Sequence, residues 1–119
     1  MSDQKIKLGK IGEEIGAKYL KAKGYKILAR NFYTRQGEID LICQKDRVIH
    51  FIEVKTRTSQ SFGWPEEAVD EKKIEKISES AQKYLQQNNI RPEWQIDIIG
   101  IIIEKENNSA RIDFFENIC

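Results

Sequence analysis

Two short apolar runs separated by four polar residues place the strongest constraint on how this chain folds. The runs are residues 39–43 and 48–54. β-Branched residues dominate both, which predicts two strands joined by a tight turn. Asp40 and Glu53 lie inside these runs, and Lys55 follows directly after the second. Charged side chains rarely enter a core unless they are paired or bind a metal, so these three residues are the first candidates for a functional site.

The length of the turn decides whether Asp40 and Glu53 face each other. Side chains alternate along a strand, so Glu53 and Lys55 share one face. A two-residue loop at 46–47 pairs residue i with residue 93 − i, which puts Asp40 directly opposite Glu53. A two-residue loop at 45–46 keeps Asp40 on the same face, diagonal to Glu53, whereas a three-residue loop turns it to the wrong face. A shared site therefore requires a loop of even length.

The hydrophobic periodicity of the whole chain predicts an α/β fold. The expected elements are a helix at 3–23, a strand at 25–33, the two strands at 39–43 and 48–54, a polar loop at 56–63, a helix from 64 to about 87, and strands at 94–104 and 110–116. Gly12 and Gly16 lie one turn apart in the first helix, where glycine is costly, so another element should approach closely there. The order αβββαββ predicts a single domain over residues 1–119, in which two helices cover a mixed five-stranded sheet.

Composition excludes several classes of protein. The longest apolar run, 98–103, is far too short to span a membrane, and the charged N-terminus lacks a signal-peptide pattern, so we expect a cytoplasmic protein. Cys43 and Cys119 predict neither a disulfide framework nor a zinc site. Net charge is only +1, but residues 1–30 hold eight Lys and Arg against three Asp and Glu, a net of +5. That basic end either faces a phosphate backbone or is a solvated helix surface.

Two carboxylates that converge across a hairpin supply the hard oxygen ligands preferred by Mg²⁺ or Mn²⁺. Such an ion lowers the pKa of a bound water and neutralises charge that develops on a phosphate. Lys55 beside it would orient the water or stabilise that charge. Glu13 would add a third carboxylate if the first helix packs over the hairpin. The alternative is a salt-bridged strand pair in which Lys55 only neutralises Glu53, because E-x-K alone is a weak motif.

The motifs that contain these residues resemble those of the PD-(D/E)xK nuclease superfamily. They are Gly12-Glu13, the segment 37–42 (GEIDLI) and the segment 51–57 (FIEVKTR). More closely, the chain resembles the YraN family of small bacterial proteins, whose fold is similar to that of restriction endonucleases and archaeal Holliday-junction resolvases. The resemblance covers nearly the whole chain. It implies a restriction-endonuclease-like fold.

The resemblance also implies a role for each matching residue. Asp40 and Glu53 match the metal-binding carboxylates, and Lys55 matches the catalytic lysine. Glu13 matches the helix-borne acid of the resolvase-like branch, in preference to Glu14. Glu38 shares the face of Asp40 and would support it. Two departures stand out: Ile39 replaces the usual proline before Asp40, and Gln95-Ile96-Asp97 replaces the Arg-Phe-Asp common in related sequences.

Several other side chains are candidates for nucleic-acid contacts. Arg35, Thr56 and Arg57 flank the expected site, where a guanidinium group could hold a phosphate, although solvated loop arginines are an equal alternative. On the second helix Lys72 is a candidate contact with nucleic acid. For both Lys72 and Lys73, however, a solvent-exposed charge is the favoured interpretation. His50 should face away from Glu53 by strand parity, so a packed or exposed strand residue is favoured over a catalytic base. Four aromatic residues could stack on bases, but core packing is favoured for them and for Tyr84: Trp64, Trp94, Phe114 and Phe115.

We therefore expect a Mg²⁺- or Mn²⁺-dependent endonuclease that acts on DNA, with a branched or otherwise structured substrate. A two-fold homodimer would suit a junction-like substrate. One alternative is a nucleic-acid-binding module that keeps the fold but has little turnover. Another is an interaction domain in which the same charges form a buried salt-bridge network.

Overall fold

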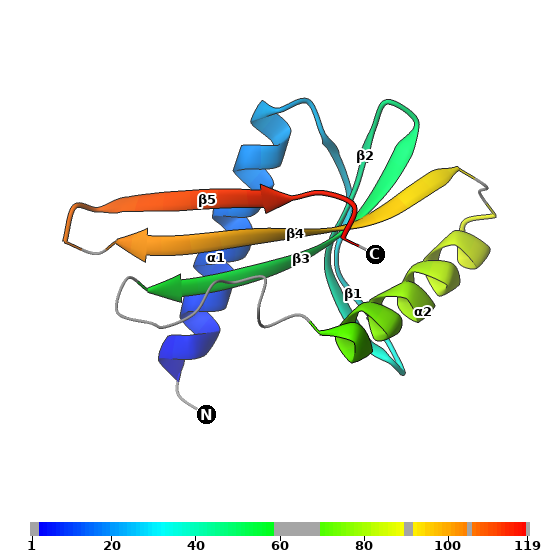
Figure 1. The fold of residues 1–119 in the computed structure, drawn as a ribbon, viewed down its shortest axis with the longest axis horizontal. Helices are drawn as coiled ribbons and strands as arrows, with labels where there is room; N and C mark the ends of the chain where they lie inside the picture. The colour runs from blue at the N-terminus through cyan, green and yellow to red at the C-terminus, as the bar shows by residue number, and fades with distance from the viewer. Residues whose placement is uncertain (1–2, 59–69, 90–91, 105, 119) are drawn as a thin grey trace.

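The computed structural model describes residues 3–58, 70–89, 92–104 and 106–118. Within these residues the chain forms α1 (Asp3–Ala22), β1 (Lys26–Thr34), β2 (Gly37–Lys45), β3 (Val48–Thr58), α2 (Glu71–Gln87), β4 (Glu93–Glu104) and β5 (Ser109–Phe115). The described strands form one five-stranded sheet in the order β1-β2-β3-β4-β5 (Figure 1). β3 and β4 run parallel, and the other neighbours are antiparallel. The predicted α/β class, element order and mixed sheet are confirmed, and they are consistent with a restriction-endonuclease-like fold.

The turn between β2 and β3 has the length that brings Asp40 and Glu53 together. Lys45 pairs with Val48 and Leu41 pairs with Ile52, which is the register predicted for a two-residue loop. Asp46 and Arg47 both have positive φ, at 51° and 67°. A two-residue hairpin loop of type I′ needs positive φ at both positions, and its twist matches that of the strands. The register places Asp40 and Glu53 at facing positions just beyond the last recorded pair.

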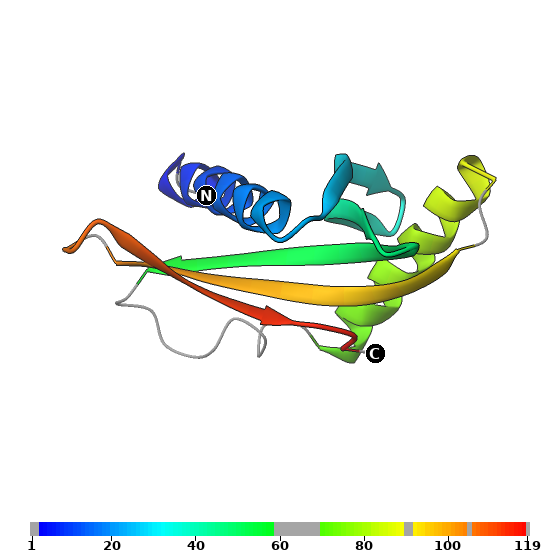
Figure 2. The same ribbon diagram turned by 90° about the horizontal axis from the view of Figure 1, so that it is seen from above.

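Each face of the sheet carries its own apolar core, and each core is closed by one helix. Leu41 and Ile52 face α1, where they pack with Ala17 and Leu20. Alternate residues of the same strands, including Phe51, face α2 and pack with Ile77 and Ala81. Figure 2 shows α1 along one side of β3 and β4, with α2 crossing the far end of the sheet. Glu53 lies two residues after Phe51 in β3, and side chains two apart in a strand share a face. The Glu53 side chain therefore points to the face of the sheet that α2 covers.

A glycine lets α1 lie close against β3. A Cβ atom built on Gly12 would come within 1.8 Å of the Thr56 Oγ1 atom and 2.8 Å of the Thr56 Cβ atom. The predicted close approach at Gly12 is therefore confirmed. At Gly16 an added Cβ would make only ordinary contacts, the nearest at 3.7 Å from Ile101. Neither helix of the described chain has the length and apolar character needed to cross a bilayer.

Two predicted boundaries are wrong. The helix expected from Trp64-Pro65 begins at Glu71, because the Asp70 backbone is extended and its side chain accepts a hydrogen bond from the Lys73 N–H. Residue 64, and with it the prediction for Trp64, lies outside the described residues. The loop expected from Thr56 begins later, since β3 continues to Thr58 and pairs with β4 over that stretch. Thr56, Arg57 and Thr58 are all polar, so both faces of this part of the strand lack a hydrophobic signal.

Candidate functional site

Two buried carboxylates, Asp40 on β2 and Glu53 on β3, form the centre of the site. Their exposed fractions are 8% and 4%. The recorded pairing of β2 with β3 ends at Leu41 opposite Ile52, and beyond that point the Asp40 side chain accepts a hydrogen bond from the Val54 N–H at 2.8 Å. Asp40 thus takes the place of a backbone acceptor where the two strands stop pairing. This bond fixes its carboxylate beside Glu53.

The burial of Asp40 beside Glu53 raises its pKa. Burial, followed by the negative charge of Glu53, raises the pKa of Asp40 to about 8, although the hydrogen bond from Val54 acts in the opposite direction. A side-chain contact with Glu53 raises the pKa of Asp40 further. Two like charges this close in a buried setting do not both ionise easily. The pair therefore holds a proton that a bound cation would replace.

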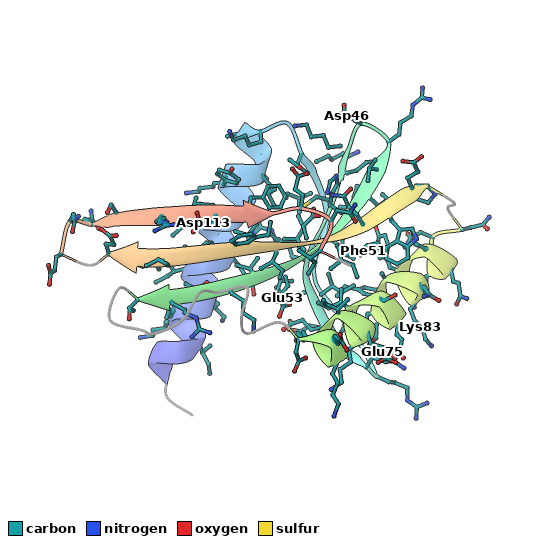
Figure 3. The ribbon with its side chains drawn as sticks, viewed as in Figure 1. Asp46, Phe51, Glu53, Glu75, Lys83 and Asp113 are labelled. Carbon is teal, nitrogen blue, oxygen red and sulfur yellow. The ribbon has the colours of Figure 1, made fainter. Side chains whose placement is uncertain are left out.

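Two lysines approach Glu53 from different elements. Lys55, two residues along β3, places its Nζ atom 3.5 Å from Oε2 of Glu53. Lys73, from the first turn of α2, places its Nζ atom 3.4 Å from the same oxygen. Figure 3 shows Glu53 between β3 and the beginning of α2. Both distances exceed the usual range for an N–H···O hydrogen bond, about 2.7–3.2 Å, so neither lysine is tightly bound to the carboxylate.

The two carboxylates and Lys55 line a cavity of about 430 Å³. Glu13, from α1, and Glu38, from β2, line it as well. Burial raises the pKa of Glu13, while a hydrogen bond with Asn31 lowers it. The structure thus brings Glu13 to the same cavity as Asp40, but among the described residues Glu13 does not join Asp40 and Glu53 in a cluster that could hold a metal ion.

Glu14, the residue next to Glu13, belongs to a different contact. Its carboxylate accepts a hydrogen bond from Nη1 of Arg30 at 2.7 Å, on the surface of the protein. The arginine lowers the pKa of Glu14 through that hydrogen bond and its charge. The preference for Glu13 over Glu14 as the site residue agrees with this geometry.

The four predicted nucleic-acid contacts fall into two groups. Thr56 and Arg57 line the cavity, and the Arg57 Nε atom is buried without a hydrogen-bond partner among the described residues. Thr56 packs under Gly12, with its hydroxyl group likewise unpartnered in the described chain. Arg35, in the β1–β2 turn, and Lys72, on α2, are exposed and are not among the residues that line the cavity.

The residues present suit a small, hard divalent cation. Asp40 and Glu53 offer carboxylate oxygens from a buried pair that lines the cavity. No three acidic, histidine or cysteine side chains of the described residues gather closely enough to enclose a metal by themselves. A two-carboxylate site leaves the remaining positions to backbone carbonyls, water and phosphate oxygens, which is how Mg²⁺ is commonly bound. The donor set therefore fits Mg²⁺ or Mn²⁺ better than a metal that needs an all-protein cage.

His50 lies outside this site, as its strand parity predicted. Its Nδ1 atom is 2.6 Å from Oδ2 of Asp97, and its ring packs edge-on against Tyr25. Asp97 is fully buried, and its second oxygen accepts hydrogen bonds from Gln95 and from the Asn117 N–H. The expected packing is confirmed for three aromatic residues: Trp94 and Tyr84 contact Phe51 in one core, and Phe114 packs against the other.

Sequence reasoning missed two residues near the site. Lys73 was expected to be solvated, but the first turn of α2 directs it to Glu53. Asn31, which has a φ of 52°, was not singled out, yet it hydrogen-bonds Glu13 from a kinked part of β1. A lysine on a lysine-rich helix gives no signal in a single sequence. An asparagine at an irregular strand position was the one available hint, because asparagine tolerates positive φ.

The chain is similar to a set of bacterial proteins. The family model described as "Uncharacterised protein family UPF0102" matches residues 12–101. A UPF0102 protein of Syntrophomonas wolfei is 52% identical over 98 residues, covering 82% of this chain and 85% of the relative. A UPF0102 protein of Caldanaerobacter subterraneus is 48% identical over 100 residues, covering 83% and 82%. A UPF0102 protein of Clostridium novyi is 42% identical over 111 residues, covering 92% of each chain. We call the cluster of Asp40, Glu53, Lys55 and Lys73 the acid–lysine site. All four residues lie inside the matched segment.

Proposed function

The chain belongs to the uncharacterised protein family UPF0102, and we propose that it is a metal-dependent endonuclease of the PD-(D/E)xK superfamily that hydrolyses phosphodiester bonds in DNA. The observation that carries the proposal is the buried pair of Asp40 and Glu53, which opens into a cavity lined by Lys55 and Arg57. Buried like charges are costly unless a cation or a proton compensates them. A perturbed acid pair in a cavity is a recognised mark of a functional site.

The position of each residue that lines the cavity suggests a role in hydrolysis. Asp40 and Glu53 would hold a Mg²⁺ or Mn²⁺ ion, with Glu13 facing the same cavity. When bound, such an ion lowers the pKa of a water ligand and offsets negative charge on the phosphate. Lys55, beside Glu53, positions the attacking water or stabilises charge in the transition state. Arg57 offers guanidinium donors to the phosphate oxygens.

Lys73 adds a second cation to this arrangement. Since Lys55 and Lys73 share one oxygen of Glu53, a divalent cation on Glu53 would compete with both. Each lysine would then be available to a phosphate oxygen. In this scheme the first turn of α2 contributes to substrate binding, through Lys73 in place of the predicted Lys72.

The test is cleavage of labelled single-stranded, duplex, flap and four-way-junction DNA, and of matching RNA, in Mg²⁺, Mn²⁺ or EDTA. We expect metal-dependent cleavage of a structured DNA, and its loss in Glu53→Gln and in Asp40→Asn. Glu75→Gln is the matched control, because Glu75 is an exposed carboxylate on α2 (Figure 3). Calorimetric titration with Mn²⁺ should show binding to the wild type and the control, but weakened binding to both site variants. Absence of both cleavage and metal binding would refute the proposal.

A nucleic-acid-binding module with little turnover is the second candidate, and one observation favours it. Lys55 and Lys73 together already neutralise Glu53 without a metal. A site satisfied in this way can bind phosphate through its lysines and arginine alone. For this candidate we expect DNA affinity that is unchanged by EDTA, together with no cleavage of any substrate.

A further inference from the structure

A second cavity of about 260 Å³ adjoins the acid–lysine site. Glu13, Glu38 and Gly9 line both cavities, so the two are neighbours. Tyr33, Asn31 and Ile6 line only the second cavity. We call this second cavity the Tyr33 groove. Tyr33, Asn31 and Ile6 have no role in the proposed hydrolysis.

The most prominent feature of the groove is an exposed aromatic ring. Tyr33 is 72% exposed, although it lies in a strand whose neighbours Phe32 and Thr34 are partly buried. It pairs across the β1–β2 hairpin with Glu38. The faces of the ring are open to solvent at this exposed position. Ile6, which is 49% exposed, adds an apolar surface on the α1 side.

The charges of the groove decide which part of a nucleic acid fits there. Glu13 and Glu38 would repel a phosphate, whereas their oxygens can accept hydrogen bonds from the exocyclic amines of bases. The amide of Asn31 can both donate to and accept from a base edge. An exposed aromatic ring stacks on any base, because every base has a π-face. Lys10, exposed on α1 at the edge of the groove, is placed for a neighbouring phosphate.

We propose that the Tyr33 groove binds one unpaired nucleobase of the substrate strand, next to the phosphodiester bond that lies at Asp40 and Glu53. This inference rests on the proposed function, and it narrows the substrate to a nucleic acid with an unpaired nucleotide beside the scissile bond. A base inside a continuous duplex is stacked on both sides and cannot reach a surface tyrosine unless it leaves the helix. A flap, bulge or branch point presents such a base without that cost.

The experiment compares three DNA duplexes that carry 2-aminopurine: one fully paired, one with the label in a single-nucleotide bulge, and one with it at a flap junction. Binding is followed by the fluorescence of the label, with Ca²⁺ replacing Mg²⁺ so that binding is seen ahead of turnover. We expect quenching on the bulged and flapped duplexes only. Tyr33→Ala should weaken their binding about 5- to 150-fold, the range that corresponds to loss of one base–aromatic stack. Affinity for the paired duplex, measured by electrophoretic mobility shift because no quenching is expected there, should change less than about twofold.

Two further variants separate stacking from other effects. Tyr33→Phe keeps the ring and should bind the duplexes like the wild type. If Tyr33 acted only through its hydroxyl group, this variant would bind as weakly as Tyr33→Ala. Ile6→Ala removes the apolar surface on the α1 side and should weaken only the bulged and flapped complexes, because Ile6 lines only the second cavity. It should not impair folding, since Ile6 is 49% exposed. The inference is overturned if Tyr33→Ala weakens all three duplexes equally, or none of them.

Cleavage of the same duplexes in Mg²⁺ distinguishes failure of the inference from failure of the proposed function. Cleavage that does not depend on Tyr33 or on an unpaired base overturns the inference alone. Binding that depends on Tyr33, without cleavage in any metal, overturns the nuclease proposal and leaves the groove as a base-binding site. A wild-type protein that binds none of the duplexes overturns the inference as well.

Discussion

The Nζ atom of Lys73 lies 3.4 Å from the Oε2 atom of Glu53, which connects the first turn of α2 to the centre of the acid–lysine site. The two residues are twenty positions apart in the chain, and no sequence motif joins them. The contact depends on where α2 begins. Asp70 caps the helix and accepts a hydrogen bond from the backbone of Lys73 itself, so the cap fixes the residue that reaches Glu53.

The contact predicts that Lys73→Ala lowers activity. Without the Lys73 side chain, Lys55 is the lysine that remains beside the buried carboxylate of Glu53. We expect a fall in kcat/KM of about 10- to 100-fold, in the range of a lost charge-assisted contact. Lys83→Ala is the matched control, because Lys83 is an exposed lysine on the same helix (Figure 3). Steady-state cleavage assays on both variants test this. Equal activity of the two variants would show that Lys73 has no part in the reaction.

Asp40 predicts a pH dependence of stability in the metal-free protein. Its pKa is raised in the folded state from the ordinary 3.8 to about 8, by burial and by Glu53. The unfolded chain therefore releases this proton at a lower pH than the folded chain does. The contribution of Asp40 to stability is fully present below about pH 4 and is lost as pH rises towards 8. Urea denaturation in EDTA between pH 5 and pH 8 should show a falling midpoint.

Asp40→Asn should flatten this pH dependence. The amide keeps an oxygen that can accept from the Val54 N–H, but it does not titrate. Added Mg²⁺ or Mn²⁺ should restore stability at pH 8 in the wild type and not in the variant. An equally steep fall in Asp40→Asn would assign the pH dependence to other groups.

The two glycines of α1 predict opposite responses to alanine. Gly12→Ala forces a Cβ atom into Thr56 of β3, so we expect a loss of about 1–3 kcal/mol in the free energy of unfolding, as for other overpacked contacts. Gly9→Ala meets open space and should stabilise the helix by about 0.5–1 kcal/mol. Chemical denaturation of the two variants gives both values. A neutral Gly12→Ala would mean that β3 can move away from α1 at little cost.

The buried pair of His50 and Asp97 predicts a purely structural role. Asp97→Ala removes the acceptor for three hydrogen bonds, from His50, Gln95 and the Asn117 N–H, and should cost about 3 kcal/mol or more. Asp113→Ala, at the exposed ion pair with Arg111, should cost less than about 1 kcal/mol. Cleavage by Asp97→Ala, measured at a temperature where the variant remains folded, should match the wild type. A loss of cleavage under those conditions would place the pair in the catalytic machinery.

The sequence was sufficient where the information is local. Alternation within two strands, together with a loop of even length, predicted that Asp40 and Glu53 face each other, and the positive φ values of Asp46 and Arg47 confirm the turn on which this depends. The glycine at position 12 predicted a close approach that the structure shows against Thr56. These features follow from short-range geometry, because strand parity and turn length are set within about fifteen residues.

Tertiary structure decided what the local pattern could not. The start of α2 at Glu71, and therefore the approach of Lys73 to Glu53, depends on a cap and on packing of the helix against the second core. The convergence of Glu13 with Glu38 and the exposure of Tyr33 depend on how α1 lies beside the β1–β2 hairpin. The sequence determined which residues could carry the chemistry, through strand parity and unusual buried charge. Only the packing of α1 and α2 against the sheet determined which distant side chains complete the site, because those contacts join residues that share no local periodicity.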